Sequence, residues 1–361
     1  MDKIIKNVLN KIEASGYEAY LVGGFVRDYL LGIKSLDIDI CTNALPKDLH
    51  KIFPNNCGSN IYGGFKLKIK NYNIEITTYR KELKYNNRKP TEVIYVNNLE
   101  EDIIRRDFTI NSICMNKNEK IIDLVNGIDS LNNREIKMLG NINKRIHEDP
   151  LRMLRAIRLA SILDFNIDKN LEVEIKNNYK LINTLSEIRI KQELNKILLN
   201  KNCLKGLSLL REYNILDLLE ISYNEICYVN DICGMWAQLK TSKSYAFTKQ
   251  EITNIINIRQ IISEGIINNK TLYKFELYNS LVAGEILNIS KKSINKMYNK
   301  LPIKSESDLQ ITSNEIINLL NIKPSKKVKE IKNELIDLVL TNKLKNQKSE
   351  LKKYILKRKE M

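Results

Sequence analysis

Two aspartates separated by one isoleucine, Asp37 and Asp39, lie in the apolar segment "LDIDI". In a β-strand, residues two apart point to the same face, so the two carboxylates project together. The apolar neighbours Leu36, Ile38 and Ile40 are then expected to point into a core. Two carboxylates on one face repel unless they share a cation, and oxygen ligands without His or Cys suit Mg²⁺. We therefore expect Asp37 and Asp39 to be metal ligands that support phosphoryl transfer, although a D-x-D pattern alone also occurs in surface loops.

A glycine pair lies just ahead of these aspartates, in "VGGFVRD". The segment follows an apolar strand, "AYLV", and opens a helix, so Gly23 and Gly24 are placed where a backbone can come close to phosphates. Arg27, one turn into that helix, can reach a phosphate bidentately. The segment is neither a Walker A loop nor the dinucleotide-binding GxGxxG pattern. Taken singly, the glycines also fit a tight turn, and Arg27 with Asp28 fits an exposed ion pair.

A mixed α/β region must position these residues. The first 140 residues contain short β-like runs, "AYLV", "LDIDI", "FKLKI", "NIEITTY" and "EVIYV", alternating with helical stretches such as "GFVRDYLLG" and "PKDLHKIF". After Pro150 no proline appears until Pro302, and apolar residues recur at helical spacing. The sequence therefore predicts an α+β domain followed by an all-α remainder.

The composition indicates a polyanionic partner. The chain has 361 residues and a net charge of +16. Half of this positive charge lies after residue 322, where there are 13 Lys/Arg and 5 Asp/Glu. A solvated helix face explains such a basic run equally well. No stretch approaches the roughly 20 apolar residues of a membrane helix. Six cysteines without a CxxC pair suit a reduced, cytoplasmic protein without a zinc site.

A second set of charged residues lies more than a hundred positions further on, in "HEDPLRMLRAIRLA". Asp149, Arg152, Arg155 and Arg158 recur every three residues. We expect one helix here, along which such a row drifts by about 60° per step. Asp149 and Arg152 can then act as a pair, whereas Arg155 and Arg158 turn toward other groups such as phosphates or RNA.

An Asp–Arg pair offers a hydrogen-bond acceptor beside a donor. Cytosine and adenine each present an amine donor beside a ring-nitrogen acceptor and match it. Uracil and guanine present the reverse order and would leave buried polar groups unpaired. Asp149 and Arg152 could thus accept CTP and ATP without a nucleic-acid template. The alternative is a local helix pair between Glu148 and Arg152.

Five segments in order resemble the class II tRNA nucleotidyltransferases, or CCA-adding enzymes, and the bacterial poly(A) polymerases, whose catalytic head belongs to the DNA polymerase β superfamily. These segments read "LVGGFVRD…LDIDICTNALP", "EDIIRRDFTINSICMN", "IIDLVNGIDSL", "EDPLRMLRAIRLASILDF" and "LSEIRIKQELNKIL". The resemblance spans about residues 18–199. It implies a polymerase-β-like head with a mixed sheet and flanking helices, followed by an all-α neck, body and tail. The implied boundaries are 1–140 for the head, 141–205 for a base-recognition neck, 206–300 for the body and 301–361 for a tRNA-binding tail.

The resemblance also implies roles for further residues. Glu75, in "NIEITTYR", would be a third carboxylate that acts as base or metal support for the attacking 3′-hydroxyl, although a plain strand-face Glu fits equally well. Arg106 would contact the incoming nucleotide and Asp107 would lie near its ribose, with a salt-bridge cluster as the alternative. Gly24 and Arg27 would take the triphosphate.

Two segments depart from the family pattern. The polar loop "KELKYNNRKPT" has Asn87-Arg88-Lys89-Pro90 where CCA-adding members have Asp before Arg-His-Pro, and "GGFKLKI" replaces the more usual Phe-Gly-Thr. The loop's presence makes a CC-only enzyme less expected, and its altered residues weaken the expectation of A addition.

We therefore expect a template-independent nucleotidyltransferase that adds C, C and A to the 3′ end of tRNA from CTP and ATP with Mg²⁺, without a membrane or an obligate protein partner. An A-adding tRNA nucleotidyltransferase or a poly(A) polymerase is the nearest alternative, and an inactive RNA-binding protein is the alternative from another class. A fused HD-type phosphohydrolase conflicts with the presence of only two histidines.

Overall fold

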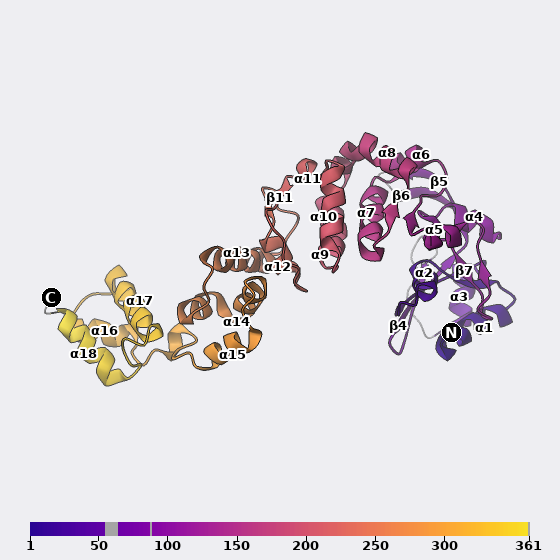
Figure 1. Ribbon diagram of the computed structural model, residues 1–361. Coiled ribbons are helices and arrows are strands. Elements are labelled where there is room, and N and C mark those ends of the chain that lie inside the picture. Colours follow the sequence, from indigo (N-terminus) through magenta and orange to yellow (C-terminus); the bar gives the residue numbers. More distant parts are fainter. Residues whose placement is uncertain (55–63, 87–88, 360–361) are drawn as a thin grey trace. The chain divides into compact units, whose positions relative to one another are not determined.

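The computed structural model separates into two compact units, Met1–Leu219 and Glu220–Met361. It describes residues 1–54, 64–86 and 89–359, with the backbone alone at 82–86 and 89–92. The six-stranded sheet lies within the first 140 residues, and helices dominate the remainder (Figure 1). This arrangement confirms the predicted fold class. The finer division into head, neck, body and tail stays a prediction.

A mixed six-stranded sheet forms the centre of the first unit, in the order β3-β4-β2-β1-β7-β8. The strands are β1 (Ala19–Val22), β2 (Asp37–Thr42), β3 (Gly64–Ile69), β4 (Tyr72–Thr78), β7 (Cys114–Met115) and β8 (Ile121–Ile122). β2 and β4 run parallel, and the other neighbours are antiparallel. The strands predicted from "AYLV", "LDIDI", "FKLKI" and "NIEITTY" are therefore confirmed.

One face of this sheet is apolar and covered by helices. Ile38, Ile40 and Phe65 are buried on it, as alternation along β2 and β3 requires. Helix α1 (Lys3–Ala14) packs on β1, and α3 (Pro46–Ile52) packs on β3. The His50 ring of α3 meets Phe65 edge-on at 5.1 Å between centroids. Both helices therefore hold the sheet from the side opposite the aspartates.

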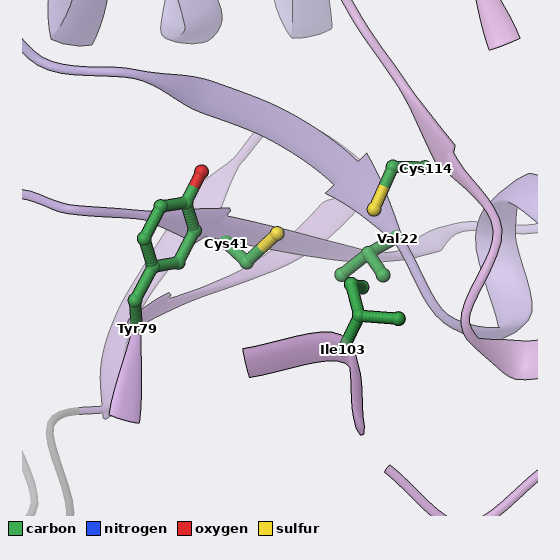
Figure 2. Close-up of a cluster of buried hydrophobic side chains, with 5 residues drawn as sticks. All are labelled: Val22, Cys41, Tyr79, Ile103 and Cys114. Atoms are coloured by element: carbon green, nitrogen blue, oxygen red, sulfur yellow. The ribbon is translucent and has the colours of Figure 1, made fainter. Parts of the chain in front are cut away.

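The other face carries the aspartates at one end and a small apolar cluster further along. Figure 2 shows this cluster, which consists of Val22, Cys41, Tyr79, Ile103 and Cys114. Cys41 follows Asp39 by two residues on the same strand, so the two side chains share a face. The cluster packs α4 (Leu99–Ile104), which supplies Ile103, against the sheet. The position of the Asp39 backbone is thereby fixed from both faces of the sheet.

The predicted polar loop after β4 is wrong in part, because its backbone forms a hairpin. β5 (Arg80–Asn86) pairs antiparallel with β6 (Lys89–Tyr95), starting at Arg80 opposite Tyr95. Backbone groups alone make this pairing, so a polar sequence can adopt it. Asn87 and Arg88 of the altered loop motif lie outside the described residues, as does Gly63 of "GGFKLKI".

The helices that complete the first unit contain one break that the sequence analysis missed. The elements are α5 (Gly127–Asn132), α6 (Ile142–Glu148), α7 (Leu151–Leu163), α8 (Lys169–Asn178), α9 (Glu187–Leu198), α10 (Cys203–Glu212) and α11 (Ile215–Leu218). "HEDPLRMLRAIRLA" is therefore two helices that meet at Asp149 and Pro150. The backbone of Asp149 is extended, at φ −149° and ψ 97°, because a following proline disfavours the helical conformation.

The second unit is mostly helical. Its helices are α12 (Ile232–Ala237), α13 (Lys249–Glu264), α14 (Asn269–Ile286), α15 (Lys291–Asn299), α16 (Ser313–Leu320), α17 (Lys326–Leu340) and α18 (Lys348–Lys359). Reciprocal capping boxes start α13, from Thr248 and Glu251, and α16, from Thr312 and Glu315. Two short strand pairs correct the prediction of an all-α remainder. In the first unit, β9 (Glu135–Ile136) pairs with β10 (Asn166–Ile167). In the second unit, β11 (Ile221–Ser222) pairs with β12 (Lys240–Thr241). Within the described ranges, the search for a helix with the length and apolarity needed to cross a bilayer found none.

Candidate active site

Three carboxylates lie on this second face of the sheet, beyond the apolar cluster, and Asp37 and Asp39 are exposed there. Asp39 on β2 is the direct partner of Glu75 on parallel β4, and directly paired residues share a face. Asp37, two residues before Asp39, accepts a 3.1 Å hydrogen bond from the amide of Asn73. The strand register therefore brings Asp37, Asp39 and Glu75 together, as the sequence predicted. Leu36 does not join the core as expected, because it precedes β2 and is 45% exposed.

Gly23 lets the turn between β1 and α2 pass directly over Asp39. Its backbone has φ 77° and ψ −149°, a region that only glycine adopts readily. A Cβ at this position would lie 2.6 Å from Asp39 Oδ2. The turn thus needs glycine for its conformation and for the close approach to Asp39. Gly24 begins α2 (Gly24–Leu30), as predicted.

The surroundings of Asp39 shift the pKa of its carboxyl group upward. Packing around the carboxylate removes water and raises the pKa of Asp39; Glu75 and Asp37 raise it further, against the opposing charges of Arg106 and Arg27. A bound cation would relieve this repulsion and stabilise the ionised form.

The donor set suits a cation that keeps some ligands outside the protein. In the described parts of the chain, no group of three or more His, Cys, Asp or Glu side chains is placed to hold a metal ion alone. Mg²⁺ is commonly bound by one or two carboxylates together with substrate phosphates and waters. Asp37 and Asp39, side by side on one exposed face, fit that mode of binding.

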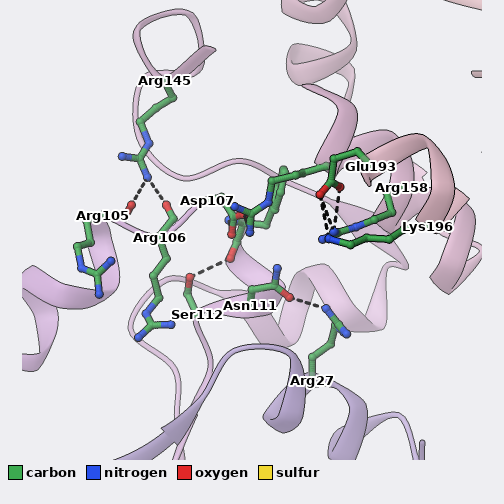
Figure 3. Close-up of polar contacts among 12 residues, drawn as sticks. Arg27, Arg105, Arg106, Asp107, Asn111, Ser112, Arg145, Arg158, Glu193 and Lys196 are labelled. Carbon is green, nitrogen blue, oxygen red and sulfur yellow. Dashed lines mark hydrogen bonds and ion pairs between the residues drawn. The ribbon is translucent and has the colours of Figure 1, made fainter. Parts of the chain in front are cut away.

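A chain of polar contacts joins α2 to α7 (Figure 3). The buried guanidinium of Arg27 donates to Asn111 Oδ1 at 2.6 Å and to Asp28 Oδ1 at 2.7 Å. Asn111 in turn hydrogen-bonds the carboxylate of Asp107, which pairs with Arg155 at 2.5 Å. Burial alone would raise the pKa of Asp107, but Arg155 and the Phe108 N–H outweigh it and hold that pKa below its ordinary value. Arg27 with Asp28 is therefore part of an internal network rather than an exposed pair.

Arg106 is anchored on α4. Its guanidinium donates to Asp102 at 2.9 Å, and Arg105 donates to the other oxygen of the same fully buried carboxylate at 2.8 Å. The guanidinium of Arg145 holds this segment from the α6 side by donating to the carbonyl oxygens of Arg105 and Arg106 (Figure 3). The buried Nε of Arg106 lacks a hydrogen-bond partner among the residues that the structure describes.

Asp149 and Arg152 do not lie on one helix, because Asp149 precedes α7. The carboxylate of Asp149 accepts a 3.2 Å hydrogen bond from the N–H of Leu151, the first residue of α7. Arg152 is buried and donates to the carbonyl of Arg145 at 2.6 Å and to Glu148 at 3.2 Å. The local Glu148–Arg152 pair that the sequence left as an alternative is therefore present. Asp149 and Arg152 are three residues apart in sequence, Asp149 at the α6–α7 junction and Arg152 in the first turn of α7.

The other two arginines of α7 diverge, as the helical drift predicted. Arg155 turns to Asp107, and Arg158 pairs with the buried carboxylate of Glu193 on α9 at 2.9 Å. Lys196 also contacts Glu193, at 3.1 Å (Figure 3). Burial lowers the pKa of Arg158, although Glu193 opposes that shift.

Sequence reasoning missed several residues that hold this site together. Asn111, Asp102, Arg145 and Glu193 each join segments that are distant in sequence or on different elements. A signal existed for three of them, because Asp102 and Asn111 lie in "EDIIRRDFTINSICMN" and Glu193 lies in "LSEIRIKQELNKIL". Their partners, however, follow only from the fold.

Comparison with known proteins gives a consistent result along the chain. Residues 19–137 match the family model of the poly(A) polymerase head domain. Residues 164–222 match the model of an RNA- and SrmB-binding site of polymerase A, and residues 226–355 match that of tRNA nucleotidyltransferase domain 2. The sequence is 33% identical to a CCA-adding enzyme of Listeria innocua over 96% of both chains, and 32% identical to one of Ligilactobacillus salivarius over 90% of this chain and 89% of the relative.

Solved structures show the same fold. The CCA-adding enzyme of Bacillus stearothermophilus in complex with CTP superposes with a TM-score of 0.88 and 25% identity, covering 100% of this chain and 98% of the other. The Thermotoga maritima CCA-adding enzyme complexed with tRNA has a TM-score of 0.67, covering 99% and 96%, and at 21% identity it bears on the fold alone.

Proposed function

Because this chain belongs to the family of CCA-adding enzymes, it is a nucleotidyltransferase, and we propose that it builds the 3′ CCA end of tRNA from CTP and ATP. The observation that carries the proposal is the set of three carboxylates, Asp37, Asp39 and Glu75, on one sheet face beside the Gly23 turn. Such a face is what in-line phosphoryl transfer requires.

In the proposed reaction, the 3′-hydroxyl of the tRNA attacks the α-phosphorus of the nucleotide. The new bond joins the 3′-oxygen to phosphorus, the bond to the bridging oxygen breaks, and pyrophosphate leaves with its electron pair. Glu75 takes the proton of the attacking hydroxyl. Asp37 and Asp39 would hold Mg²⁺, which supplies charge stabilisation for the attacking and leaving oxygens.

The network beside the carboxylates would position the nucleotide. Gly24 and Arg27 would take the triphosphate, since the buried Arg27 is already oriented by Asn111 and Asp28. Arg106 would contact the nucleotide, and Asp107, held by Arg155, would lie near its ribose. Pre-orientation of these groups by protein contacts reduces the entropy lost when the substrate binds.

Asp149 and Arg152 would read the base, with Arg155 and Arg158 turned toward neighbouring groups. We expect Arg152→Ala and Asp149→Ala to lower the preference for CTP and ATP over UTP and GTP by about tenfold or more. Without these side chains, a bound uracil or guanine would no longer leave a buried carboxylate or guanidinium unpaired. Single-nucleotide incorporation with each nucleotide measures this preference. Glu148→Gln is the matched comparison: if it alone reproduced the loss, the Glu148–Arg152 pair would be the determinant instead.

The carboxylate face can be tested directly. We expect Asp37→Asn and Asp39→Asn each to lower kcat by about a thousandfold or more, since metal-assisted charge stabilisation contributes several kcal/mol to the barrier. Asp48→Asn, on α3 behind the opposite sheet face, is the control and should stay near wild type. Activity of the Asp39→Asn enzyme within tenfold of wild type would contradict the assignment.

The remaining expectations concern the setting of the reaction. We place the enzyme in the cytoplasm, where its tRNA substrate is processed. The basic helices α17 and α18 would contact the tRNA backbone. Several of their cations also pair within the fold, such as Lys332 with Glu306 at 2.7 Å and Arg358 with Glu334 at 2.8 Å. Only part of the basic charge in this region is therefore free to bind RNA.

A further inference from the structure

The edge strand β3 places two lysines on the face that carries the carboxylates. Lys66 is the direct antiparallel partner of Glu75, and Lys68 is the partner of Asn73, whose own neighbour on β2 is Asp37. Both lysines are exposed, whereas Phe65 and Leu67 between and beside them are buried on the opposite face. The sheet therefore presents Lys66, Glu75 and Asp39 in one row across three strands.

This row has a direction, because its two ends carry different groups. At the β1 end, the Gly23 turn lies against Asp39, and Arg27 is buried in the contacts of α2. At the β3 end, beyond Glu75, Lys66 and Lys68 form the border of the face. None of the roles assigned above uses these two lysines.

In-line displacement assigns a substrate to each end of the row. The attacking oxygen and the leaving oxygen lie on opposite sides of the phosphorus in such a reaction. Our proposal places the leaving pyrophosphate on the Gly24 and Arg27 side. The attacking 3′-hydroxyl must then approach from the Glu75 side, where β3 is the next strand.

We propose that Lys66 and Lys68 bind the phosphates of the last nucleotides of the tRNA acceptor strand. The inference rests on the proposed function and names the surface that receives the RNA substrate. Neighbouring strands are about 4.8 Å apart, so the amine of Lys66 can reach a phosphate next to the hydroxyl that Glu75 contacts. Residues two apart on a strand are separated by about 6.6 Å, which lets each lysine contact a different phosphate. The two cations also offset the repulsion between the RNA phosphates and the three carboxylates.

The first test separates RNA binding from nucleotide binding. We expect Lys66→Met and Lys68→Met each to raise KM for tRNA by up to about fivefold, with KM for CTP unchanged and kcat altered less than KM. The dependence of tRNA affinity on salt should also become shallower, by about 0.7 in the logarithmic slope per lysine. Lys66→Arg should restore both quantities. Lys51→Met, on α3 behind the opposite face, is the matched control.

A role of Lys66 confined to Glu75 gives a different pattern. If the lysine only set the charge state of Glu75, Lys66→Met would lower kcat and shift its pH profile while KM for tRNA and the salt slope stayed at wild-type values. That result would overturn the proposal, as would values for both variants equal to those of Lys51→Met.

The second test locates the contact on the RNA. It measures equilibrium binding of a tRNA whose two 3′-terminal linkages are uncharged methylphosphonates, to wild type and to the Lys66→Met/Lys68→Met protein. We expect the modified tRNA to bind wild type more weakly than the normal tRNA does. The double variant should bind both tRNAs equally, so the effects of the protein change and the RNA change should not add. Additive losses would overturn the inference. Because binding needs no turnover, a wild-type protein that failed to add nucleotides would refute the proposed function and leave this cycle readable.

Discussion

Gly23 is the single residue on which the placement of Asp39 depends most closely. We expect Gly23→Ala to destabilise the protein by about 1–3 kcal/mol through backbone strain. We also expect it to lower kcat strongly, because the added Cβ would lie 2.6 Å from Asp39 Oδ2 and would push the carboxylate out of place. Thermal unfolding and steady-state kinetics measure the two effects.

Gly32→Ala separates strain from displacement. Gly32 also has a positive φ, of 71°, but a Cβ there would meet no atom within 4 Å. The Gly32→Ala substitution should therefore destabilise the fold without a matching loss of activity. If both alanine variants lost activity equally, the contact between Gly23 and Asp39 would not matter for catalysis.

At the residue scale, the positions of side chains were predictable where they follow local spacing. The period of two in a strand placed Asp37 and Asp39 on one face, and the register of β4 then added Glu75. Local spacing gave a wrong prediction at Asp149: the three-residue spacing indicated one continuous helix, but the helix breaks before Pro150. Proline restricts the preceding residue by sterics, so the break was readable from the sequence.

At the scale of elements, α4 is fixed to the following segment by a buried carboxylate. Burial alone would raise the pKa of Asp102, but Arg106 and Arg105 outweigh it and hold that pKa below its ordinary value. A depressed pKa stabilises the fold above the unfolded-state pKa of about 3.9, and this stability is lost as the pH falls through the folded-state value.

We therefore expect Asp102→Asn to reduce the free energy of unfolding at pH 7 by about 3–5 kcal/mol, because two guanidinium groups lose their buried partner. The difference from wild type should shrink near pH 3, because part of this stability is lost once the pH falls below the unfolded-state pKa of about 3.9. Urea unfolding at the two pH values measures this, with exposed Glu100→Gln on the same helix as the control. An equal difference at both pH values would show that the charge of Asp102 is not the cause.

Elements were predictable from the sequence where periodicity is strong and less so where backbone pairing acts alone. The sheet strands and α2 follow from alternation and from the glycine turn. The run "EVIYV" likewise predicted the second half of β6, whereas β5 and the start of β6 are polar and give no apolar face to recognise. The partners Asn111 and Glu193 depend on contacts between distant segments, which no local pattern encodes.

At the scale of the whole molecule, fold class and chemistry were predicted by different parts of the chain. The change from β-like runs to helical spacing near residue 140 predicted a mixed sheet followed by helices, and the structure confirms it. The net charge of +16 predicted a polyanionic partner, and the family comparisons agree with a tRNA substrate. Charge alone does not select tRNA or a particular base.

The most direct test of the account is nucleotide addition to three tRNAs, ending before CCA, after the first C and after the second C, with each nucleotide supplied singly. We predict CTP incorporation into the first two and ATP incorporation into the third, with UTP and GTP used at most at about one-hundredth of those rates. Incorporation of ATP without any use of CTP would contradict the central claim and indicate an A-adding enzyme instead.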